Sequence, residues 1–486
     1  MGTIGAHAPQ RPDLVPLLRR LENFDVCGEF LLTEMGHGLD ARNLETTATK
    51  QPGGGFKLHT PNSSAAKVMP PTSPLGGIPR VGVVLARLIV DGADHGVKPF
   101  IVELSDERGM MPGVSSQLLP KRCGAKALDH CITTFTNVRL SQEALLGSLD
   151  KPENERIDFM RQIHRVPVGT LSLSLAHIPM LKTSALIVGT YSCRRRVARG
   201  AEAHAQMPIL SFPTQYRPIL DTFVLANAFD AFADYAIAKF MDTSLPMEVR
   251  HGVAVCFKGT VTPDAAAMYN ELAERCGWQG LFAYNSVIEL GMAARGNAVA
   301  EGDYTVLCIR LVSEVLLGRY KLPGATTETI LGRHEAGVWQ EAREMMMAFG
   351  RESHRSEEAN AYLLPRCRDI VKATGYRMAY EAAVASAKFR PEALALLEST
   401  CMKADLSWYC QHEGVKRNEF IVRDSQLARQ ALPLLQEFIR QGDASGSVVA
   451  PIMNQGSWDE FVDSLPMSTL TPVVAMEEPL APAYHL

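Results

Sequence analysis

FLLTEMGHGLDARNLETTATK, residues 30–50, is the most informative stretch of this chain. Its apolar beginning followed by Gly36 and Gly38 is typical of a tight turn after a β-strand. The surrounding region, from about residue 27 to 149, is rich in Gly, Pro and Thr, and turn signals such as QPGGGF separate its short β-like runs. The clearest runs are VGVVLARLIV (81–90), KPFIVEL (98–104) and CITTFTNVRL (131–140). We therefore expect a mainly antiparallel β-domain or barrel here.

The chain changes to helical spacing from about residue 156. Residues 171–200 predict one long helix that ends at Gly200, and residues 223–242 predict a second. Residues 263–277 predict a third and a fourth begins after Asp303, which together would make one bundle. A further helical region follows Pro323, and the tail from about Gly442 is expected to be loose. In that region PEALALLESTCMKADLSWYC predicts a helix that starts at Pro391; its apolar face comprises Leu394, Leu397, Cys401, Ala404 and Trp408.

The composition is that of a globular protein. The 486 residues suffice for two or three domains, with 46% hydrophobic and 21% charged residues. A formal net charge of -4 argues against binding to nucleic acid or to an anionic membrane. No apolar run approaches the length of a transmembrane helix, and the N-terminus lacks the apolar core of a signal peptide. The ten cysteines stand singly and no H-E-x-x-H occurs, so we expect a reduced intracellular protein without a metal site.

VAEGDYTVL, residues 299–307, places the carboxylate of Glu301 just before a helix start. Asp303 is a plausible N-cap, and the apolar residues after it have helical spacing. Glu301 would then lie outside the first turn, where the backbone amide dipoles point toward it. Such a carboxylate either caps the helix or faces a ligand, and the local pattern leaves both open.

The motif T-E-x-G-H-G followed by R-x-L-E-T-T-A-T resembles the flavin-side segment of the peroxisomal acyl-CoA oxidases, within the acyl-CoA dehydrogenase superfamily. The resemblance covers nearly the whole chain. It implies an α+β fold in which a central β-barrel domain precedes two helical bundle domains. The implied divisions are a remnant of an N-terminal helical region (1–27), the barrel (28–150), a bundle that carries Glu301 (151–325), a C-terminal oxidase-like helical domain (326–465) and a flexible tail (466–486). The similar segments also include HTPNSSAAK (59–67), FTNVRLSQEALLG (135–147), ILSFPTQY (209–216), AEGDYTVL (300–307) and DLSWYCQHEGV (405–415).

The resemblance assigns Glu301 as the base that removes the α-proton of an acyl-CoA thioester, while the β-hydrogen leaves as hydride to FAD. A carboxylate in an apolar pocket becomes a competent base, because burial favours its protonated form. In the family, the backbone N–H of the same glutamate and a flavin hydroxyl polarise the thioester carbonyl. The hydride chemistry would belong to FAD, which the protein positions.

Other positions match residues that hold FAD in the family. Arg194 matches an arginine that contacts the pyrophosphate across a dimer interface, so the resemblance implies at least a homodimer; its alternative role is a solvated helix end. Gly277 and Gly280 match a segment near the adenine half. The remaining FAD candidates are Leu32, Thr33, Gly38, Met69 and Gln215.

Several departures from the family pattern leave the reaction open. KVMPPTSP (67–74) replaces K-W-W-P-G-G-L-G, so Met69 stands for a tryptophan that covers the flavin and Pro71 for a glycine associated with oxygen access. Trp278 and Leu281 alter the adenine-side segment. Only a short segment precedes the motif, where the family has a helical domain, so we expect a more open pocket and a more solvated base.

The departures favour a specialised substrate, such as a biosynthetic thioester on CoA or a carrier protein. The alternatives are a non-catalytic homologue that acts as a partner subunit, and a flavin monooxygenase on the same fold. The C-terminal AYHL resembles a peroxisomal S-K-L-type address in part, so the expected location is peroxisomal or cytoplasmic.

Overall fold

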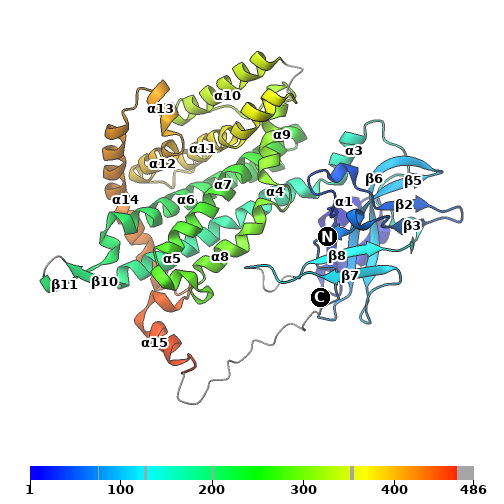
Figure 1. Cartoon of the computed structure of the whole chain (residues 1–486), viewed down its shortest axis with the longest axis horizontal. Coiled ribbons are helices and arrows are strands. Elements are labelled where there is room, and N and C mark those ends of the chain that lie inside the picture. The colour runs from blue at the N-terminus through cyan, green and yellow to red at the C-terminus, as the bar shows by residue number, and fades with distance from the viewer. Residues whose placement is uncertain (75, 125–128, 200–201, 351–354, 468–486) are drawn as a thin grey trace.

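The computed structural model describes residues 1–74, 76–124, 129–199, 202–350 and 355–467. It is a mixed, mostly helical fold, in which the strands between residues 27 and 140 gather at one end and the long helices at the other (Figure 1). The strands are β1 (Cys27–Leu31), β2 (Thr47–Lys50), β3 (Phe56–His59), β4 (Lys67–Val68), β5 (Arg80–Val90), β6 (Ala93–Ser105), β7 (Val114–Leu118), β8 (Cys131–Phe135), β9 (Val138–Leu140), β10 (Arg196–Arg199) and β11 (Glu202–Pro208).

The strands of the β-region form two sheets. The larger runs β1-β5-β2-β3-β9, with β6 also paired to β5, and the smaller runs β4-β8-β7. The long β5–β6 hairpin turns at Asp91 and Gly92, whose φ angles of 50° and 80° suit the tight turn that Asp-Gly favours. Most pairings are antiparallel, as expected, but β1 and β2 both run parallel to β5. Closure of these sheets into a barrel stays a prediction.

Two short helices, α1 (Gly2–His7) and α2 (Val15–Glu22), precede the strands of the β-region. The remaining α-helices are α3 (Glu155–Gln162), α4 (Arg165–Leu175), α5 (His177–Arg194), α6 (Pro213–Met241), α7 (Met247–Glu274), α8 (Val287–Ala294), α9 (Tyr304–Leu316), α10 (Ile330–Phe349), α11 (Cys367–Ala385), α12 (Pro391–Lys403), α13 (Leu406–His412), α14 (Arg417–Ser445) and α15 (Gln455–Asp463).

The long helix expected over residues 171–200 is two helices and a strand. It is interrupted at Ala176, because Pro179 has no N–H to offer the carbonyl of Leu175 and its ring crowds that carbonyl. The helix ends at Arg194, where β10 begins, and the predicted end at Gly200 lies outside the described residues.

Three further helix predictions are corrected. The expected helix at 263–277 begins at Met247 and runs through Pro263, since both flanks of that proline are buried in the bundle. The expected helix at 391–410 starts at Pro391 as predicted but divides before α13, where the Asp405 side chain accepts from the N–H of Trp408. The tail expected to be loose contains α15, because its aromatic residues pack against Trp278 and Tyr284.

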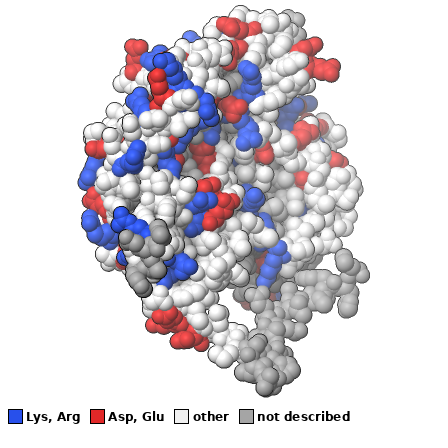
Figure 2. All heavy atoms as spheres, turned by 60° about the vertical axis from the view of Figure 1, so that its left-hand side comes forward, with Lys and Arg blue, Asp and Glu red and all other residues white. Residues whose placement is uncertain are grey.

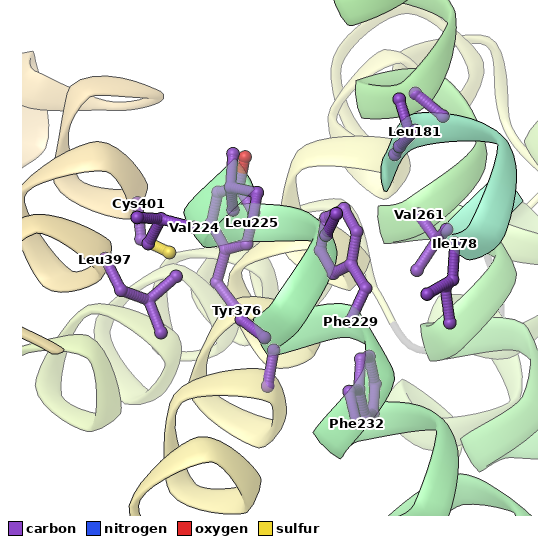
Figure 3. Packing of buried hydrophobic residues seen from close by; sticks show 14 of the residues in the cluster. Ile178, Leu181, Val224, Leu225, Phe229, Phe232, Val261, Tyr376, Leu397 and Cys401 are labelled. Atoms are coloured by element: carbon purple, nitrogen blue, oxygen red, sulfur yellow. The ribbon is translucent and has the colours of Figure 1, made fainter. Parts of the chain in front are cut away.

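One hydrophobic cluster runs through the helical part, from Leu171 to Met453. In Figure 3, Val224 of α6 lies beside Leu397 and Cys401 of α12, and Phe229 projects from the same helix. Helix α6 therefore packs against helices on both sides of residue 325, where we placed a domain boundary. A separate cluster, which includes Leu31, fills the β-region.

The segment Arg165–Arg194 is long and apolar enough, by length and composition, to cross a membrane. This corrects the expectation that no run approaches that length. Within the fold, 56% of its most apolar window is buried against other parts of the chain, and core helices pass the same test.

Over the face in Figure 2, Lys and Arg are interspersed with Asp and Glu.

Candidate active site

The Glu301 segment connects a short helical turn, Arg295–Ala298, to α9. The carboxylate of Asp303 accepts hydrogen bonds from the N–H groups of Thr305 and Val306, which confirms the predicted N-cap. Glu301 has a φ of 52° and Gly302 a φ of 92°. Two consecutive residues in the left-handed region turn the chain sharply at the carboxylate. Such a conformation is costly for a residue with a Cβ, so the surrounding contacts must hold it.

Helix α4 supplies much of that hold. The Thr170 hydroxyl donates to the Glu301 carbonyl at 2.8 Å, and Arg165 Nη1 donates to the Glu301 carboxylate. The side chain of Glu301 is only 15% exposed and that of Arg165 is 43% exposed. The carboxylate is therefore largely enclosed, and its cation lies on the outer side.

Arg165 also joins the helices to the β-region. Its guanidinium lies 4.9 Å from the ring centre of Phe30 in β1, within the range of a cation–π contact. Phe30 begins the stretch that carries the T-E-x-G-H-G motif. The Glu301 carboxylate is thus linked through one side chain to the strand that leads into the predicted flavin segment.

Lys258 of α7 holds the other face of the same turn. Its Nζ donates to the carbonyls of Ala300 and Gly302, both at 2.6 Å, and the side chain is fully buried. Burial lowers the pKa of Lys258 to about 8, against the opposing effect of Glu301 and Asp303. Sequence reasoning missed Lys258, Arg165 and Thr170, because no local spacing connects them with Glu301.

The flavin-side candidates Leu32, Thr33 and Met69 come together around β4. Val68 N–H donates to the Thr33 carbonyl at 3.0 Å, and Lys67 Nζ donates to the Leu32 carbonyl at 3.1 Å. Met69 follows directly and is 44% exposed. Gly38 lies nearby in sequence on an exposed turn with open space around it. Three of the four candidates therefore lie close together, linked through Lys67 and Val68 of β4.

A buried ion pair fixes this segment. The carboxylate of Glu34 accepts from Lys67 Nζ at 2.9 Å and from the N–H groups of Glu45 and Thr46. Both charged side chains are fully buried. Burial alone would raise the pKa of Glu34, but Lys67 and the two amides outweigh it and lower that pKa, while burial lowers the pKa of Lys67 to about 8.

The remaining candidates form a second group at the far end of α5. Arg194 donates to the Ile452 carbonyl at 3.0 Å and to the Gln455 side chain at 2.7 Å, both in the C-terminal segment that ends in α15. Gln215 donates to Ser192 and to the Arg275 carbonyl. Gly280 is required sterically, since a Cβ there would lie 1.9 Å from the Ala273 carbonyl oxygen, and Gly277 has a φ of 60°. Figure 1 shows β10, which follows α5, and α15 on the side of the helices away from the sheets of the β-region.

Each group contains a buried acceptor atom that lacks a partner among the described residues. His130 Nδ1 lies 3.1 Å from the Met69 carbonyl, so in the neutral ring its Nε2 is an acceptor, and that atom is buried without a hydrogen bond. Gln279 Oε1, between Gly277 and Gly280, is likewise buried and unsatisfied. FAD carries N–H donors on both its flavin ring and its adenine. The residues present therefore fit the polar edges of this cofactor.

Two open clefts lie elsewhere. One of about 560 Å³ is lined by α10, α11 and α13, and another of about 360 Å³ lies beside β5 and β6. Glu301 lines neither of them. Within the described ranges, no group of three or more His, Cys, Asp or Glu side chains is placed to hold a metal ion.

Known proteins similar to this chain are acyl-CoA oxidases. Residues 171–316 match the family model of the acyl-CoA oxidase C-alpha1 domain. Peroxisomal acyl-coenzyme A oxidase 3 of Homo sapiens is 27% identical over 330 residues, 62% of this chain and 46% of that protein. Acyl-coenzyme A oxidase 2 of Arabidopsis thaliana is 28% identical over 354 residues, 68% of this chain and 50% of that one. The chain spans about half the length of the curated relatives it matches.

Solved structures share the fold. Acyl-CoA oxidase-1 of Caenorhabditis elegans, complexed with FAD and ATP, superposes with a TM-score of 0.80 at 18% identity, covering 95% of this chain and 78% of that one. Acyl-CoA oxidase-2 of the same organism gives 0.79 at 17% identity, covering 97% and 79%. The matched range includes Glu301 with α7 and α9, whereas Arg165 and Thr170 of α4 lie just before it. The chain therefore carries a C-alpha1 domain of the acyl-CoA oxidases at residues 171–316, and it is similar to these oxidases in sequence and in fold.

Proposed function

We propose that this chain is an FAD-dependent enzyme that oxidises an acyl thioester at its α and β carbons, with Glu301 as the base. The observation that carries the proposal is the restrained turn at Glu301. Three elements hold it: the Asp303 cap on α9, Arg165 and Thr170 on α4, and Lys258 on α7. A capping role would require none of the contacts to α4 and α7, since Asp303 already caps the helix.

Glu301 would accept the α-proton on its carboxylate. Its enclosure excludes much of the surrounding water, while Arg165 orients the carboxylate from the outer side. The Glu301 backbone N–H would donate to the thioester carbonyl and so stabilise the negative charge that develops there. The α-proton thus passes to the carboxylate as the carbonyl oxygen gains charge.

FAD would be held by the two groups described above. The flavin-side residues are Leu32, Thr33, Gly38 and Met69, with His130 Nε2 available to an N–H donor. Arg194, Gln215, Gly277 and Gly280 would serve the adenine and pyrophosphate half. When bound, FAD supplies the acceptor for the β-hydrogen and its two electrons.

The separation of the two groups within the chain supports a homodimer, in which each FAD contacts both copies. We propose the same domains as from the sequence: a central β-barrel (28–150), the catalytic bundle (151–325), the oxidase-like helical domain (326–465) and flanking segments at 1–27 and 466–486. Most of the last segment lies outside the described residues. The substrate would be an acyl thioester on CoA or a carrier protein. The names of relatives support a peroxisomal location, with the cytoplasm as the alternative.

The visible absorbance of the purified chain tests the proposal. We expect oxidised-flavin bands at about one per chain, anaerobic bleaching on addition of acyl-CoA, and loss of bleaching in Glu301→Gln. A colourless chain that takes up no added FAD would overturn it and favour a non-catalytic partner subunit. Full activity of Glu301→Gln would also overturn it and favour a flavin monooxygenase, which needs no α-proton base.

A further inference from the structure

Lys258 lies in a position that a core lysine rarely occupies. It is fully buried in the middle of α7, and its hydrogen bonds go to two carbonyl oxygens, those of Ala300 and Gly302. Lys67, which is also fully buried and has a comparable pKa, contacts the carboxylate of Glu34 as well as a carbonyl. Burying an ammonium is unfavourable, so an apolar side chain would serve packing better. The cost indicates that the two carbonyls themselves need a donor.

The geometry of the peptide bond shows what that donor fixes. In a trans peptide the C=O and the following N–H point in opposite directions. The Ala300 carbonyl points at Lys258 and therefore toward α7, so the N–H of Glu301 points away from α7. Lys258 thus sets the direction of the backbone N–H that belongs to the proposed base.

The neighbouring carbonyls complete the restraint. The Glu301 carbonyl accepts from Thr170 on α4, and the Gly302 carbonyl accepts from Lys258. Three consecutive carbonyls are therefore held by two side chains from two helices. Between them, Glu301 keeps its left-handed conformation, and rotation of either adjoining peptide would break at least one of these bonds.

We propose that Lys258 is a positioning residue that orients the Glu301 peptide so that its N–H meets the thioester carbonyl while its carboxylate meets the α-proton. This inference rests on the proposed function. It adds a residue outside the contact with substrate, acting through the backbone of Glu301. Removing its donors would weaken recognition of the carbonyl more than recognition of the rest of the ligand.

A pair of ligands separates these effects. An acyl-CoA and its thioether analogue, which has CH₂ in place of the carbonyl, differ only at the acceptor atom. Their binding is measured at equilibrium on FAD-loaded Glu301→Gln, which prevents turnover, and on the same chain carrying Lys258→Met. We expect the second change to weaken thioester binding by roughly 5- to 10-fold and to leave thioether binding unchanged, as for loss of one well-placed hydrogen bond. Cys256→Ala, a buried change two residues earlier on α7, is the control and should leave the ratio of thioester affinity to thioether affinity unchanged.

An unchanged ratio of thioester affinity to thioether affinity would overturn the proposal. Equal weakening of both ligands is one such outcome, and it would mean that Lys258 only supports the fold. If neither ligand binds to FAD-loaded Glu301→Gln, the proposed function itself fails. Should Lys258→Met not fold, Lys258→Gln is measured in the same way. Glutamine retains an N–H donor on a shorter side chain. We therefore expect its ratio of thioester affinity to thioether affinity to lie between that of the parent and that expected for a chain without a donor at this position.

Discussion

Gly169 lies directly against Glu301: a Cβ on Gly169 would come within 2.5 Å of the Glu301 Cγ and Cδ. Helix α4 therefore leaves room for the carboxylate through the absence of one methyl group. This contact packs the turn that carries Glu301, just before α9, against α4.

Gly169→Ala should lower turnover by about 100-fold, since a displacement of the base by about 1 Å is enough for such a loss. The free energy of unfolding should not show the gain of about 0.5–1 kcal/mol that alanine normally brings to a helix. Steady-state kinetics and urea unfolding measure both. Gly5→Ala in α1, where a Cβ meets nothing within 4 Å, is the matched control. Unchanged turnover in Gly169→Ala would show that Glu301 can shift without consequence.

The contact between Arg165 and Phe30 should couple the β-region to the helices. A double-mutant cycle with Arg165→Met and Phe30→Leu should give a coupling free energy of about 0.5–1 kcal/mol, the range for a partly exposed cation–π pair. Chemical unfolding of the parent, the two single variants and the double variant measures it. Additive effects would mean that the two side chains are neighbours without a stabilising interaction.

The Glu34–Lys67 pair should be intolerant of losing one partner. Glu34→Gln leaves a buried ammonium without its counterion and should lower the free energy of unfolding by about 3–5 kcal/mol. The double variant Glu34→Gln with Lys67→Met should recover part of that loss, because the unpaired charge is gone. Urea unfolding of the three chains tests this, and a loss below about 1 kcal/mol in the single variant would contradict it.

His130 should contribute to FAD binding through its unpartnered Nε2. His130→Phe should weaken FAD binding by roughly 5- to 10-fold, as for one lost hydrogen bond to a buried acceptor. Fluorescence titration of the chain after removal of FAD gives the dissociation constant. His95→Phe is the control, since His95 also contacts a carbonyl in the β-region, that of Leu149. Equal weakening in both variants would point to general damage to the sheets.

Acid should destabilise the chain through His177. Burial, and then the charge of Lys258, lower the pKa of His177 to about 4, so the folded chain keeps this ring neutral. The unfolded ring titrates near 6.5. As the pH falls from about 6.5 toward 4, the unfolded state therefore gains the proton first, and stability decreases by about 3 kcal/mol. His177→Gln should show a shallower decrease over this range by urea unfolding, and an identical slope would contradict the assignment.

The local parts of the fold were predictable from the sequence. Asp303 could be recognised as an N-cap because the signal lies within three residues of the helix that it caps. The Asp-Gly turn between β5 and β6 follows from the same kind of short-range chemistry. Helix interruptions were missed where a side chain competes with the backbone, as Asp405 does before α13.

The surroundings of Glu301 could not be predicted in this way. Arg165 lies 136 positions before it, and Lys258 lies 42 positions before Ala300, so only the packing of α4 against α7 brings them together. No periodic pattern encodes a contact between a helix and a distant turn. The resemblance indicated Glu301 itself but none of the side chains that hold it.

The positive φ of Glu301 has a consequence for the engineering of this protein. A residue with a side chain is strained there, so Glu301→Gly would relieve the strain and is expected to raise the melting temperature. A library selected for thermal tolerance alone would therefore enrich chains that have lost the carboxylate. Directed evolution of this scaffold needs a screen for turnover in every round, because one expected stabilising change removes the proposed base.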